Sequence, residues 1–310
     1  MSARGVTITG ATGLIGPRLI NALRERDGGC QVSVLTRDPE RAHERLGDVD
    51  AVAWDPMSGP APVEALRGRA AFINLAGELI AQRWNANARQ AIRDSRVLGT
   101  RNLLAGLEAA GQDGERPSVL ISSSATGYYG PHGEEPLDED APAGSDFLAR
   151  VCAEWEAEAR RAGELGMRSV QLRTGVVLDA SGGALAKMLP PFRLGVGGPV
   201  AGGRQYISWV HPDDLLGIML AALDDERWSG PVNGTAPEPV SNREFSRVLG
   251  RVLRRPAFAP VPGAALRLLY GEMAEIVTSG ARVVPAKALV LGYDFSQPRL
   301  EQALRSALAA

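Results

Sequence analysis

The fold is decided near the N-terminus by the stretch Val6-Thr7-Ile8-Thr9-Gly10-Ala11-Thr12-Gly13-Leu14-Ile15-Gly16-Pro17. A β-branched run leads into three glycines spaced three apart, and a helical pattern follows at once. In this order Gly10 permits a tight turn, Gly13 lets backbone amides come close to a ligand, and Gly16 lets the helix pack against the strand. A helix N-terminus carries unpaired N–H groups and partial positive charge, so the stretch predicts a turn that binds a pyrophosphate. The alternative is an ordinary strand-to-helix turn that happens to contain three glycines.

Outward from this turn, segments rich in Val, Ile and Leu alternate with segments of helical periodicity through about residue 180. This alternation is typical of a parallel sheet with helices on both faces. The predicted strands are Gly5–Thr9, Gln31–Thr36, Ala51–Trp54, Ala71–Leu75, Ser118–Ser122 and Ser169–Arg173. The predicted helices are Pro17–Asp27, Trp84–Ala110 and Phe147–Leu165. Right-handed crossovers would join these units into a doubly wound, Rossmann-type α/β fold.

Beyond residue 180 the chain is interrupted by Gly and Pro, which favours a loop-rich region. Strands are then predicted at Tyr206–Val210 and Pro231–Asn233, and helices at Asp213–Leu223, Asn242–Leu253, Ala264–Ile276 and Gln297–Leu308. We therefore predict a nucleotide-binding domain from residues 1–178 plus 206–235. A smaller, interleaved C-terminal α/β domain would comprise residues 179–205 plus 236–310.

Composition excludes several classes of partner. The 34 basic and 36 acidic residues are mixed along the chain, so no single-signed surface is expected to attract nucleic acid or anionic lipid. Two cysteines and three scattered histidines are too few and too far apart to predict a disulfide framework or a metal site. The first predicted strand leaves no room for a signal peptide, and no apolar run reaches the roughly 20 residues that span a bilayer. We expect a cytoplasmic protein that does not associate with membranes.

The end of the second predicted strand indicates which dinucleotide is bound. NAD-specific proteins usually place Asp or Glu there to accept the ribose 2′-hydroxyl, whereas this chain has Thr36 and Arg37. A guanidinium suits a 2′-phosphate because it makes charge-assisted bidentate bonds, so NADP(H) is the predicted cofactor. Arg41 is a further candidate. Asp38 argues in the other direction, and Arg37 read as a solvated surface residue is the alternative.

Three motifs resemble the extended short-chain dehydrogenase/reductase superfamily, which includes the nucleotide-sugar epimerases. They are the glycine turn, Asn74-Leu75-Ala76-Gly77, and the stretch Ser122–Gly130. Further stretches narrow the resemblance to the atypical "epimerase family protein" group, which has a small C-terminal domain of unassigned role. These stretches are Arg83-Trp84-Asn85, Phe147–Cys152, Trp155-Glu156, Pro191-Phe192-Arg193 and Tyr270–Met273, and with the motifs they span essentially the whole chain.

The resemblance implies a set of cofactor contacts. Together with the turn, they make the predicted NADP(H) site Gly10, Thr12, Gly13, Leu14, Ile15, Gly16, Thr36, Arg37, Leu75, Ala76, Gly77, Arg96 and Val176. Leu75 and Ala76 offer a small apolar wall, and Arg96 offers a cation to a phosphate. As alternatives, Leu75 and Ala76 are ordinary strand residues and Arg96 is a solvated helix charge.

The superfamily's proton-transfer residues are a Tyr-x-x-x-Lys pair aided by Ser or Thr, because a phenol of pKa near ~10 needs a neighbouring cation to ionise. Ser124 occupies the serine position, but Leu148 and Cys152 stand where Tyr and Lys should be. Neither can replace the pair. We therefore name Ser124, Tyr128 and Tyr129 as catalytic candidates, the tyrosines as substitute acids. In the alternative interpretation the tyrosines stack beside the nicotinamide or line the pocket without titrating, and Ser124 caps the end of its strand.

Other polar side chains expected near the cleft are Glu78, Arg83, Arg173, Arg204, His211 and Asp214. Glu78 would pair with Arg83 or meet substrate, and the segment from His211 to Asp214 most simply begins a helix. Trp84, Trp155 and Trp209 are interpreted as packing residues.

Three hypotheses follow. The first is an NADP(H)-dependent oxidoreductase or epimerase-like enzyme that acts on a small carbonyl or carbinol substrate. The second is a sensor or regulatory module that binds NADP(H) without turnover, which the missing Tyr-Lys pair favours. The third is a partner-binding subunit that docks through residues 260–310. A homodimer is possible through long helices such as Trp84–Ala110.

Overall fold

The computed structural model describes residues 5–26, 29–111 and 117–309. Its strands are β1 (Gly5–Thr9), β2 (Gln31–Thr36), β3 (Asp50–Ala53), β4 (Ala71–Asn74), β5 (Val119–Ala125), β6 (Pro136–Leu137), β7 (Arg168–Thr174), β8 (Val176–Val177), β9 (Tyr206–Ile207), β10 (Trp209–Val210), β11 (Gly230–Gly234), β12 (Val240–Ser241) and β13 (Arg282–Val283). Its α-helices are α1 (Gly16–Arg24), α2 (Pro39–Leu46), α3 (Ala86–Ala110), α4 (Phe147–Arg160), α5 (Gly183–Arg193), α6 (Pro212–Asp224), α7 (Asn242–Leu253), α8 (Gly263–Tyr270), α9 (Glu275–Thr278), α10 (Ala286–Val290) and α11 (Leu300–Ala309). Short 3₁₀ turns lie at η1 (Val63–Ala65), η3 (Thr126–Tyr129), η4 (Arg161–Leu165) and η5 (Gly271–Ala274).

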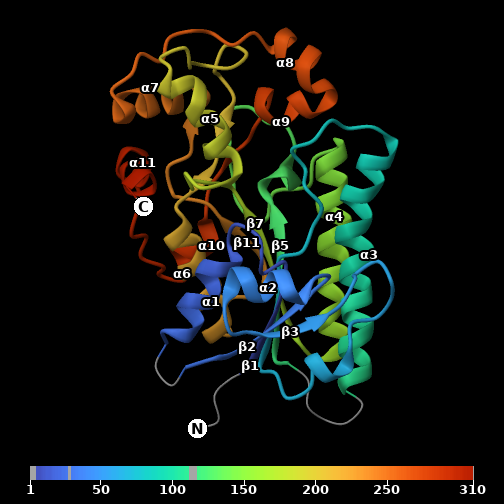
Figure 1. Ribbon diagram of the computed structural model, residues 1–310. Coiled ribbons are helices and arrows are strands. Elements are labelled where there is room, and N and C mark those ends of the chain that lie inside the picture. The colour runs from blue at the N-terminus through green and yellow to red at the C-terminus, as the bar shows by residue number, and fades with distance from the viewer. Residues whose placement is uncertain (1–4, 27–28, 112–116, 310) are drawn as a thin grey trace.

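In the described chain, seven strands form one parallel sheet in the order β11-β7-β5-β4-β1-β2-β3. The order in which the chain adds strands reverses at β1. Strands β2 and β3 extend the sheet on one side of β1, and β4 pairs with β1 on the other side. Helices α3 and α4 lie side by side against one face, and α1 and α6 lie on the other (Figure 1). The predicted doubly wound α/β fold is confirmed, and the carboxyl ends of β1 and β4 place a ligand site at the reversal.

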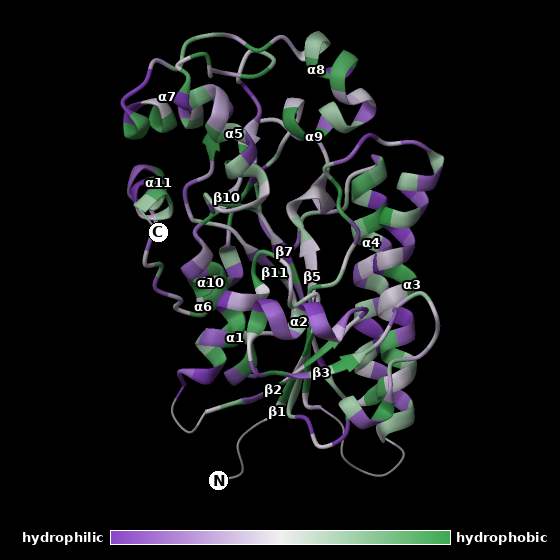
Figure 2. Ribbon diagram, viewed as in Figure 1, coloured by the Kyte–Doolittle hydropathy of each residue, from purple (hydrophilic) through white to green (hydrophobic). Residues whose placement is uncertain are grey.

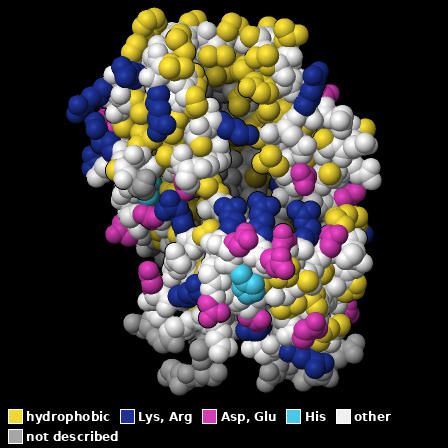
Figure 3. All heavy atoms as spheres, in the orientation of Figure 1, with side chains coloured by type: hydrophobic (Ala, Val, Ile, Leu, Met, Phe, Trp, Pro, Cys, Tyr) yellow, Lys and Arg dark blue, Asp and Glu magenta, His cyan; other side chains and the backbone are white. Residues whose placement is uncertain are grey.

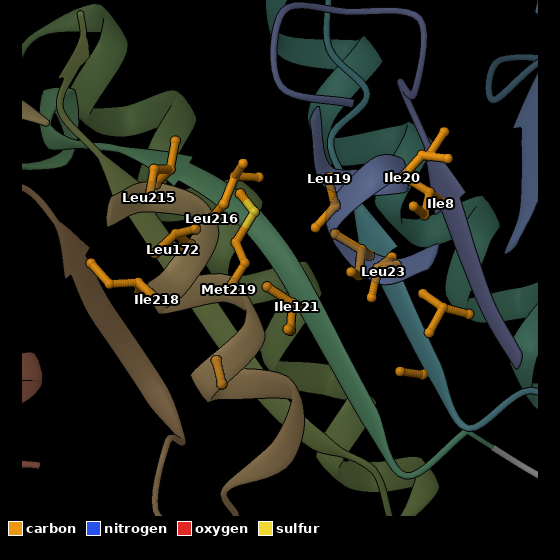
Figure 4. Packing of buried hydrophobic residues seen from close by; sticks show 14 of the residues in the cluster. Ile8, Leu19, Ile20, Leu23, Ile121, Leu172, Leu215, Leu216, Ile218 and Met219 are labelled. Carbon is orange, nitrogen blue, oxygen red and sulfur yellow. The ribbon is translucent and has the colours of Figure 1, made fainter. Parts of the chain in front are cut away.

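The apolar residues that predicted the fold form the core on the α1 side. Leu19, Ile20 and Leu23 lie on one face of α1 and are fully buried with Ile8 of β1 (Figure 4). Ile121 and Leu172 come from the strands, and Leu215, Leu216, Ile218 and Met219 come from α6. Hydrophobic residues run along the strands of the sheet (Figure 2), as expected where both faces are covered.

Three helices lie where the sequence did not predict them, namely α2, α5 and the short α10. Helix α2 buries only Ala42 and Leu46, so its sequence shows little apolar periodicity; it begins because Asp38 caps it and Pro39 opens its first turn. Helix α5 lies in the region expected to be loop-rich and has Pro190 and Pro191 in its last turn.

Several predicted helices differ in their bounds. The helix predicted over Phe147–Leu165 ends as α4 at Arg160 and is followed by η4, and the one predicted over Gln297–Leu308 begins at Leu300. The helix predicted over Ala264–Ile276 is divided into α8, η5 and α9, because Gly271 adopts a left-handed φ of 63°. The helix predicted to begin at Trp84 begins at Ala86, after Asn85 caps it. The predicted end of the first helix, Asp27, lies outside the described residues.

The C-terminal segment returns to the main sheet after leaving it. Strand β13 pairs with β6 in the loop after β5, and Ala288 and Phe295 join the core of the main sheet. By contrast, α5, α7 and α11 share a separate apolar core that includes Leu185, Phe245 and Leu304. The division into residues 1–178 plus 206–235 and the remainder stays a prediction, and its ends at 1 and 310 lie outside the described residues. None of the described helices is long and apolar enough to cross a membrane.

Candidate functional site

The glycine turn has the geometry that a bound dinucleotide requires. Gly10 adopts a φ of 65°, and a Cβ there would lie 2.6 Å from the Leu75 carbonyl carbon. A Cβ on Gly16 would lie 1.9 Å from the carbonyl oxygen of Ala11, so α1 could not approach the turn with any larger residue. Ile15, at the N-cap of α1, offers no side-chain acceptor to the first-turn amides. These amides are therefore available to an anion, and the residues present fit a pyrophosphate.

A buried hydrogen-bond chain holds the second wall of the site. Thr9 donates its hydroxyl to Asn74 Oδ1 at 2.6 Å, and Asn74 Nδ2 donates to Thr100 Oγ1 at 3.0 Å. The indole of Trp155 donates to the same Thr100 oxygen at 2.9 Å, while the amide of Ala76 donates to Thr9 Oγ1 at 3.3 Å. This chain links β1, β4, α3 and α4, so it fixes the turn at residues 74–77 beside the glycine turn.

A cavity of about 250 Å³ opens between these walls. Of the predicted residues it is lined by Gly10, Gly13, Leu14, Ile15, Gly16, Leu75, Ala76, Gly77, Arg96 and Ser124. Most of its other lining residues are apolar. Helix α4 contributes Leu148, Val151, Cys152 and Trp155, and α6 contributes Leu215 and Met219. Two halves of the predicted site, the cofactor turn and the serine, therefore meet in one cavity.

A second cavity of about 480 Å³ lies on the other side of the glycine turn. It is lined by Thr12, Gly13, Leu14, Pro17, Arg18, Arg45, Ser181, Gly182 and Gly183. The buried carboxylate of Asp179 holds its far wall, since Asp179 Oδ1 accepts from the amide and hydroxyl of Ser181. Arg18 pairs with Asp179 at 3.1 Å, whereas Arg45 has no ion pair within the described chain. Figure 3 shows Lys and Arg side chains along the lower edge of a hollow in this face of the molecule.

The predicted residues at the end of β2 lie outside both cavities. Arg37 is exposed, and the Thr36 hydroxyl is bonded to the backbone of Asp38. Asp38 is also exposed and caps α2, since its Oδ1 accepts from the amide of Arg41 at 3.0 Å. Val176 also lines neither cavity and pairs with Trp209 in a short parallel ladder.

Arg96 lies inside the first cavity and is largely buried. Its Nη1 donates to the carbonyl oxygens of Glu78 and Ile92, and its guanidinium lies 5.3 Å from the ring centroid of Trp155. Gly77 permits this placement, because a Cβ there would lie 2.9 Å from Arg96 Cζ. Burial lowers the pKa of Arg96 from its ordinary value, and the neighbouring Cys152 and Glu78 oppose that shift. The side chain offers a buried cation to a ligand in the cavity, not the solvated charge of the alternative interpretation.

Leu148 and Cys152, which stand at the expected Tyr and Lys positions, both line the cavity. Burial raises the pKa of Cys152 to about 12, with the charge of Glu156 adding to the effect. A neutral thiol and an alkyl side chain cannot supply the ammonium and phenol of the superfamily.

A buried ion pair lies directly behind Ser124. Arg173 Nε and Nη2 donate to the two carboxylate oxygens of Glu156 at 2.8 and 2.9 Å, and both side chains are almost completely buried. Burial alone would lower the pKa of Arg173, but the hydrogen bonds and charge of Glu156 outweigh it and hold that pKa above its ordinary value. The Ser124 hydroxyl donates to Glu156 Oε1 at 2.7 Å.

The two tyrosines pack against Arg173 and do not line the cavity. Tyr129 is fully buried, donates its hydroxyl to Asn233 Oδ1 at 2.7 Å and accepts from Arg173 Nη1 at 2.9 Å. Burial raises the pKa of Tyr129 to about 12, although the charge of Arg173 opposes the shift. The ring of Tyr128 is half-buried and its centroid lies 3.5 Å from Arg173 Cζ. Neither tyrosine lies in the cavity as either interpretation of the sequence expected, and both pack beside Arg173 instead.

Three of the remaining candidates lie near loops. Glu78 accepts from Gln82 at 3.4 Å, and no ion pair joins it to the exposed Arg83 in the described chain. Arg204 is exposed.

The other two candidates have structural contacts at α6. His211 caps this helix, with its Nδ1 accepting from the Asp213 amide, which confirms the predicted helix start. Asp214 is buried and accepts from Ser296 and Gln297.

Glu156 is the residue of the site that sequence reasoning missed. It was used only to align the helix, although its spacing of four from Cys152 places both on one face of α4. Its partner Arg173 was a candidate on β7, but no local pattern pairs the two.

Comparisons with known proteins agree with this geometry. The model of the NAD-dependent epimerase/dehydratase family matches residues 6–233, and a domain of unknown function (DUF1731) matches residues 261–307. A chloroplastic homologue of epimerase family protein SDR39U1 from Arabidopsis thaliana is 39% identical over 301 residues, which are 97% of this chain and 86% of that protein. The human epimerase family protein SDR39U1 is 36% identical over 309 residues, covering 98% of this chain and 99% of the human one.

A crystal structure of human SDR39U1 isoform 2 with NADPH resembles this chain throughout. The TM-score is 0.86 at 35% sequence identity, with 99% of this chain and 100% of that chain covered. The resemblance inferred from the motifs is confirmed. The chain belongs to the NAD-dependent epimerase/dehydratase family, and its C-terminal residues 261–307 match the domain of unknown function.

Proposed function

We propose that this protein binds NADP(H) across the glycine turn and acts as an oxidoreductase or epimerase-like enzyme on a small carbonyl or carbinol substrate. The observation that carries the proposal is the single cavity that joins Gly13–Gly16, Arg96 and Ser124. The human relative crystallised with NADPH supports the choice of nucleotide. Bound NADP(H) would supply the hydride chemistry.

The chain's own residues would share the work of binding. The amides of Leu14 and Ile15 at the start of α1 would hold the pyrophosphate, and Arg37 would pair with the 2′-phosphate. The remaining predicted contacts, Thr12, Thr36 and Val176, stay predictions, as does Tyr128 as a proton donor. Ser124 would contact the reacting ligand. Tyr129 would hold Arg173, because its hydroxyl is already bonded within the protein.

A non-catalytic NADP(H) sensor is the second candidate, and one observation favours it. Leu148 and Cys152 line the cavity where a proton-transfer pair would be needed, and neither side chain can transfer a proton near neutral pH. A sensor needs the same nucleotide affinity without turnover.

A fluorescence titration with NADPH and with NADH tests the proposal. Wild type should prefer NADPH by at least about tenfold, and Arg37→Ala should remove most of that preference, because a lost phosphate contact costs roughly 1.5–3 kcal/mol. Arg267→Ala, an exposed arginine on α8, is the matched control and should bind like wild type. Failure of wild type to bind either nucleotide would contradict the proposal.

Turnover then separates the two candidates. Oxidation of NADPH in the presence of a panel of carbonyl compounds, lost in Ser124→Ala, would identify an enzyme. Tight binding with no oxidation across the panel would identify the sensor. A homodimer, a cytoplasmic location and the two-domain division also remain proposals.

A further inference from the structure

The polar groups behind Ser124 determine which way its hydroxyl points. A carboxylate that receives two parallel N–H bonds from a guanidinium is ionised and can only accept hydrogen bonds. Glu156 is in this state, since Arg173 donates to both of its oxygens at 2.8 and 2.9 Å. Glu156 Oε2 also lies 3.6 Å from Arg160 Nη1 in an ion pair. In its contact with Ser124 Oγ at 2.7 Å, the serine must therefore be the donor.

Further contacts hold the Arg173 side chain in position against Glu156. Its remaining nitrogen, Nη1, donates to the Tyr129 hydroxyl at 2.9 Å and to the Glu139 carbonyl at 3.0 Å, and its guanidinium lies against the Tyr128 ring. The side chain of Glu156 has no exposed surface, and that of Arg173 is 2% exposed. An ion pair this buried and this fully bonded keeps one geometry, because removing either partner leaves an uncompensated buried charge.

A serine hydroxyl has one proton and two lone pairs. With its proton directed at Glu156, Ser124 can present only lone pairs to the cavity that it lines. We infer that Glu156, held by Arg173, is a positioning residue that makes Ser124 a hydrogen-bond acceptor toward the ligand. The thiol of Cys152 is a hydrogen-bond neighbour of Ser124 and can donate to one lone pair. A ligand group that bonds to the other lone pair must then be a donor, which means a hydroxyl or an amide N–H and not a bare carbonyl oxygen.

This inference rests on the proposed function in one respect, namely that the cavity is the ligand site. It also indicates which oxidation state of the substrate the site favours. Of a carbonyl and its carbinol, only the carbinol carries the O–H that a lone pair on Ser124 can accept, so the site favours the alcohol form of a substrate. The carboxamide N–H of a nicotinamide has the same donor chemistry and is the other possible source.

Proton exchange at the serine hydroxyls tests the inference on the full chain without any nucleotide. In protein labelled with ¹³C at the serine Cβ atoms and dissolved in equal parts of H₂O and D₂O, a slowly exchanging hydroxyl gives two Cβ lines and a free one gives a single averaged line. Ser124, assigned from Ser124→Ala, should give two lines in wild type and one line in Glu156→Met, which keeps the length of the side chain but removes the oxygen acceptors. Ser169 is the control, because its hydroxyl donates to the Ala159 carbonyl at 2.7 Å and does not contact Glu156. It should give two lines in both proteins.

A single Ser124 line in wild type, or two lines that persist in Glu156→Met, overturns the inference. If Glu156→Met does not fold, Glu156→Asp replaces it, because it keeps the charge but withdraws the carboxylate by one methylene. Failure of the protein to bind nucleotide would overturn the proposed function and leave this measurement intact.

A second experiment identifies whether the cofactor or the substrate supplies the donor group that bonds to Ser124. NADPH is compared with its acetylpyridine analogue, in which a methyl ketone replaces the carboxamide and no N–H remains. A wild-type preference for NADPH that Ser124→Ala removes, about tenfold for one hydrogen bond, would assign the donor to the carboxamide. The same ratio in both proteins would assign it to a substrate hydroxyl.

Discussion

At the scale of single residues, His211 shows how one side chain can serve as a cap and also make folding depend on pH. It is buried at the N-cap of α6 and accepts from the Asp213 amide through Nδ1, which requires an unprotonated nitrogen. Burial lowers the pKa of His211 from its ordinary 6.5, while Asp213, Asp214 and Asp179 oppose the shift and Arg18 adds to it. The folded state therefore holds the neutral imidazole.

The sign of the pH effect follows from that shift. Because the pKa of His211 is lower in the folded than in the unfolded chain, the unfolded chain binds more protons between the two values, and stability falls as pH drops below about 6.5. We expect the urea midpoint of wild type to fall more between pH 7.5 and pH 5.5 than that of His211→Asn, which keeps a capping acceptor without titrating. Equal losses in the two proteins would show that other groups control the fall in stability at acid pH.

At the scale of elements, α2 places two arginines on one face. Arg41 and Arg45 are four residues apart within the helix, and Arg37 lies just before its Asp38 cap. All three are exposed and have no ion pair in the described chain. Arg45 lines a cavity with Thr12 and Gly13, so the last turn of α2 lies beside the glycine turn.

This arrangement predicts that Arg45, which no sequence motif indicated, contributes to the recognition of a phosphate. Arg45→Ala should weaken NADPH binding by roughly 3- to 10-fold and leave NADH binding unchanged, because only NADPH carries the 2′-phosphate. The measurement is the same fluorescence titration, with Arg267→Ala as the control. An equal loss for both nucleotides would instead place Arg45 at the pyrophosphate, and no loss for either would remove it from the site.

At the scale of the whole molecule, the C-terminal segment is held to α6 by polar contacts with the buried carboxylate of Asp214. Asp214 at the start of α6 accepts from the Ser296 amide at 2.7 Å, the Ser296 hydroxyl at 2.9 Å and the Gln297 amide at 3.0 Å. Its neighbour Asp213 has a side chain that is 59% exposed. The segment before α11 is thus fixed by one carboxylate across 82 residues of sequence.

Replacing that carboxylate should loosen the C-terminal end. Asp214→Ala leaves the amides of Ser296 and Gln297 without an acceptor and should lower the free energy of unfolding by roughly 2–4 kcal/mol. Asp213→Ala should change it by less than about 0.5 kcal/mol. Urea unfolding measures both values, and limited proteolysis should cleave near Ser296 faster in Asp214→Ala only. Similar losses in the two variants would contradict this role for Asp214.

The sequence alone predicted the features that depend on neighbours within a few positions. The glycine turn and the strands around it follow from conformations that β-branched residues and glycine adopt locally, and helix α7 begins as predicted because Ser241 caps it within one turn. The family resemblance was readable for the same reason, since its motifs are short and contiguous. Helix α2 was missed because a short, mostly charged helix buries too little to show a period.

Tertiary structure alone decided the polar network of the candidate site. Glu156 and Arg173 are 17 residues apart, and Tyr129 bonds to Asn233 across 104 residues, so no local pattern could pair them. Whether Tyr129 titrates or packs depends on how completely the surrounding segments exclude water, which is a property of the assembled fold. The sequence determined that a dinucleotide turn exists, because backbone conformation is set locally; the folded chain determined which side chains face the ligand, because burial and ion pairing are set by the segments that pack together.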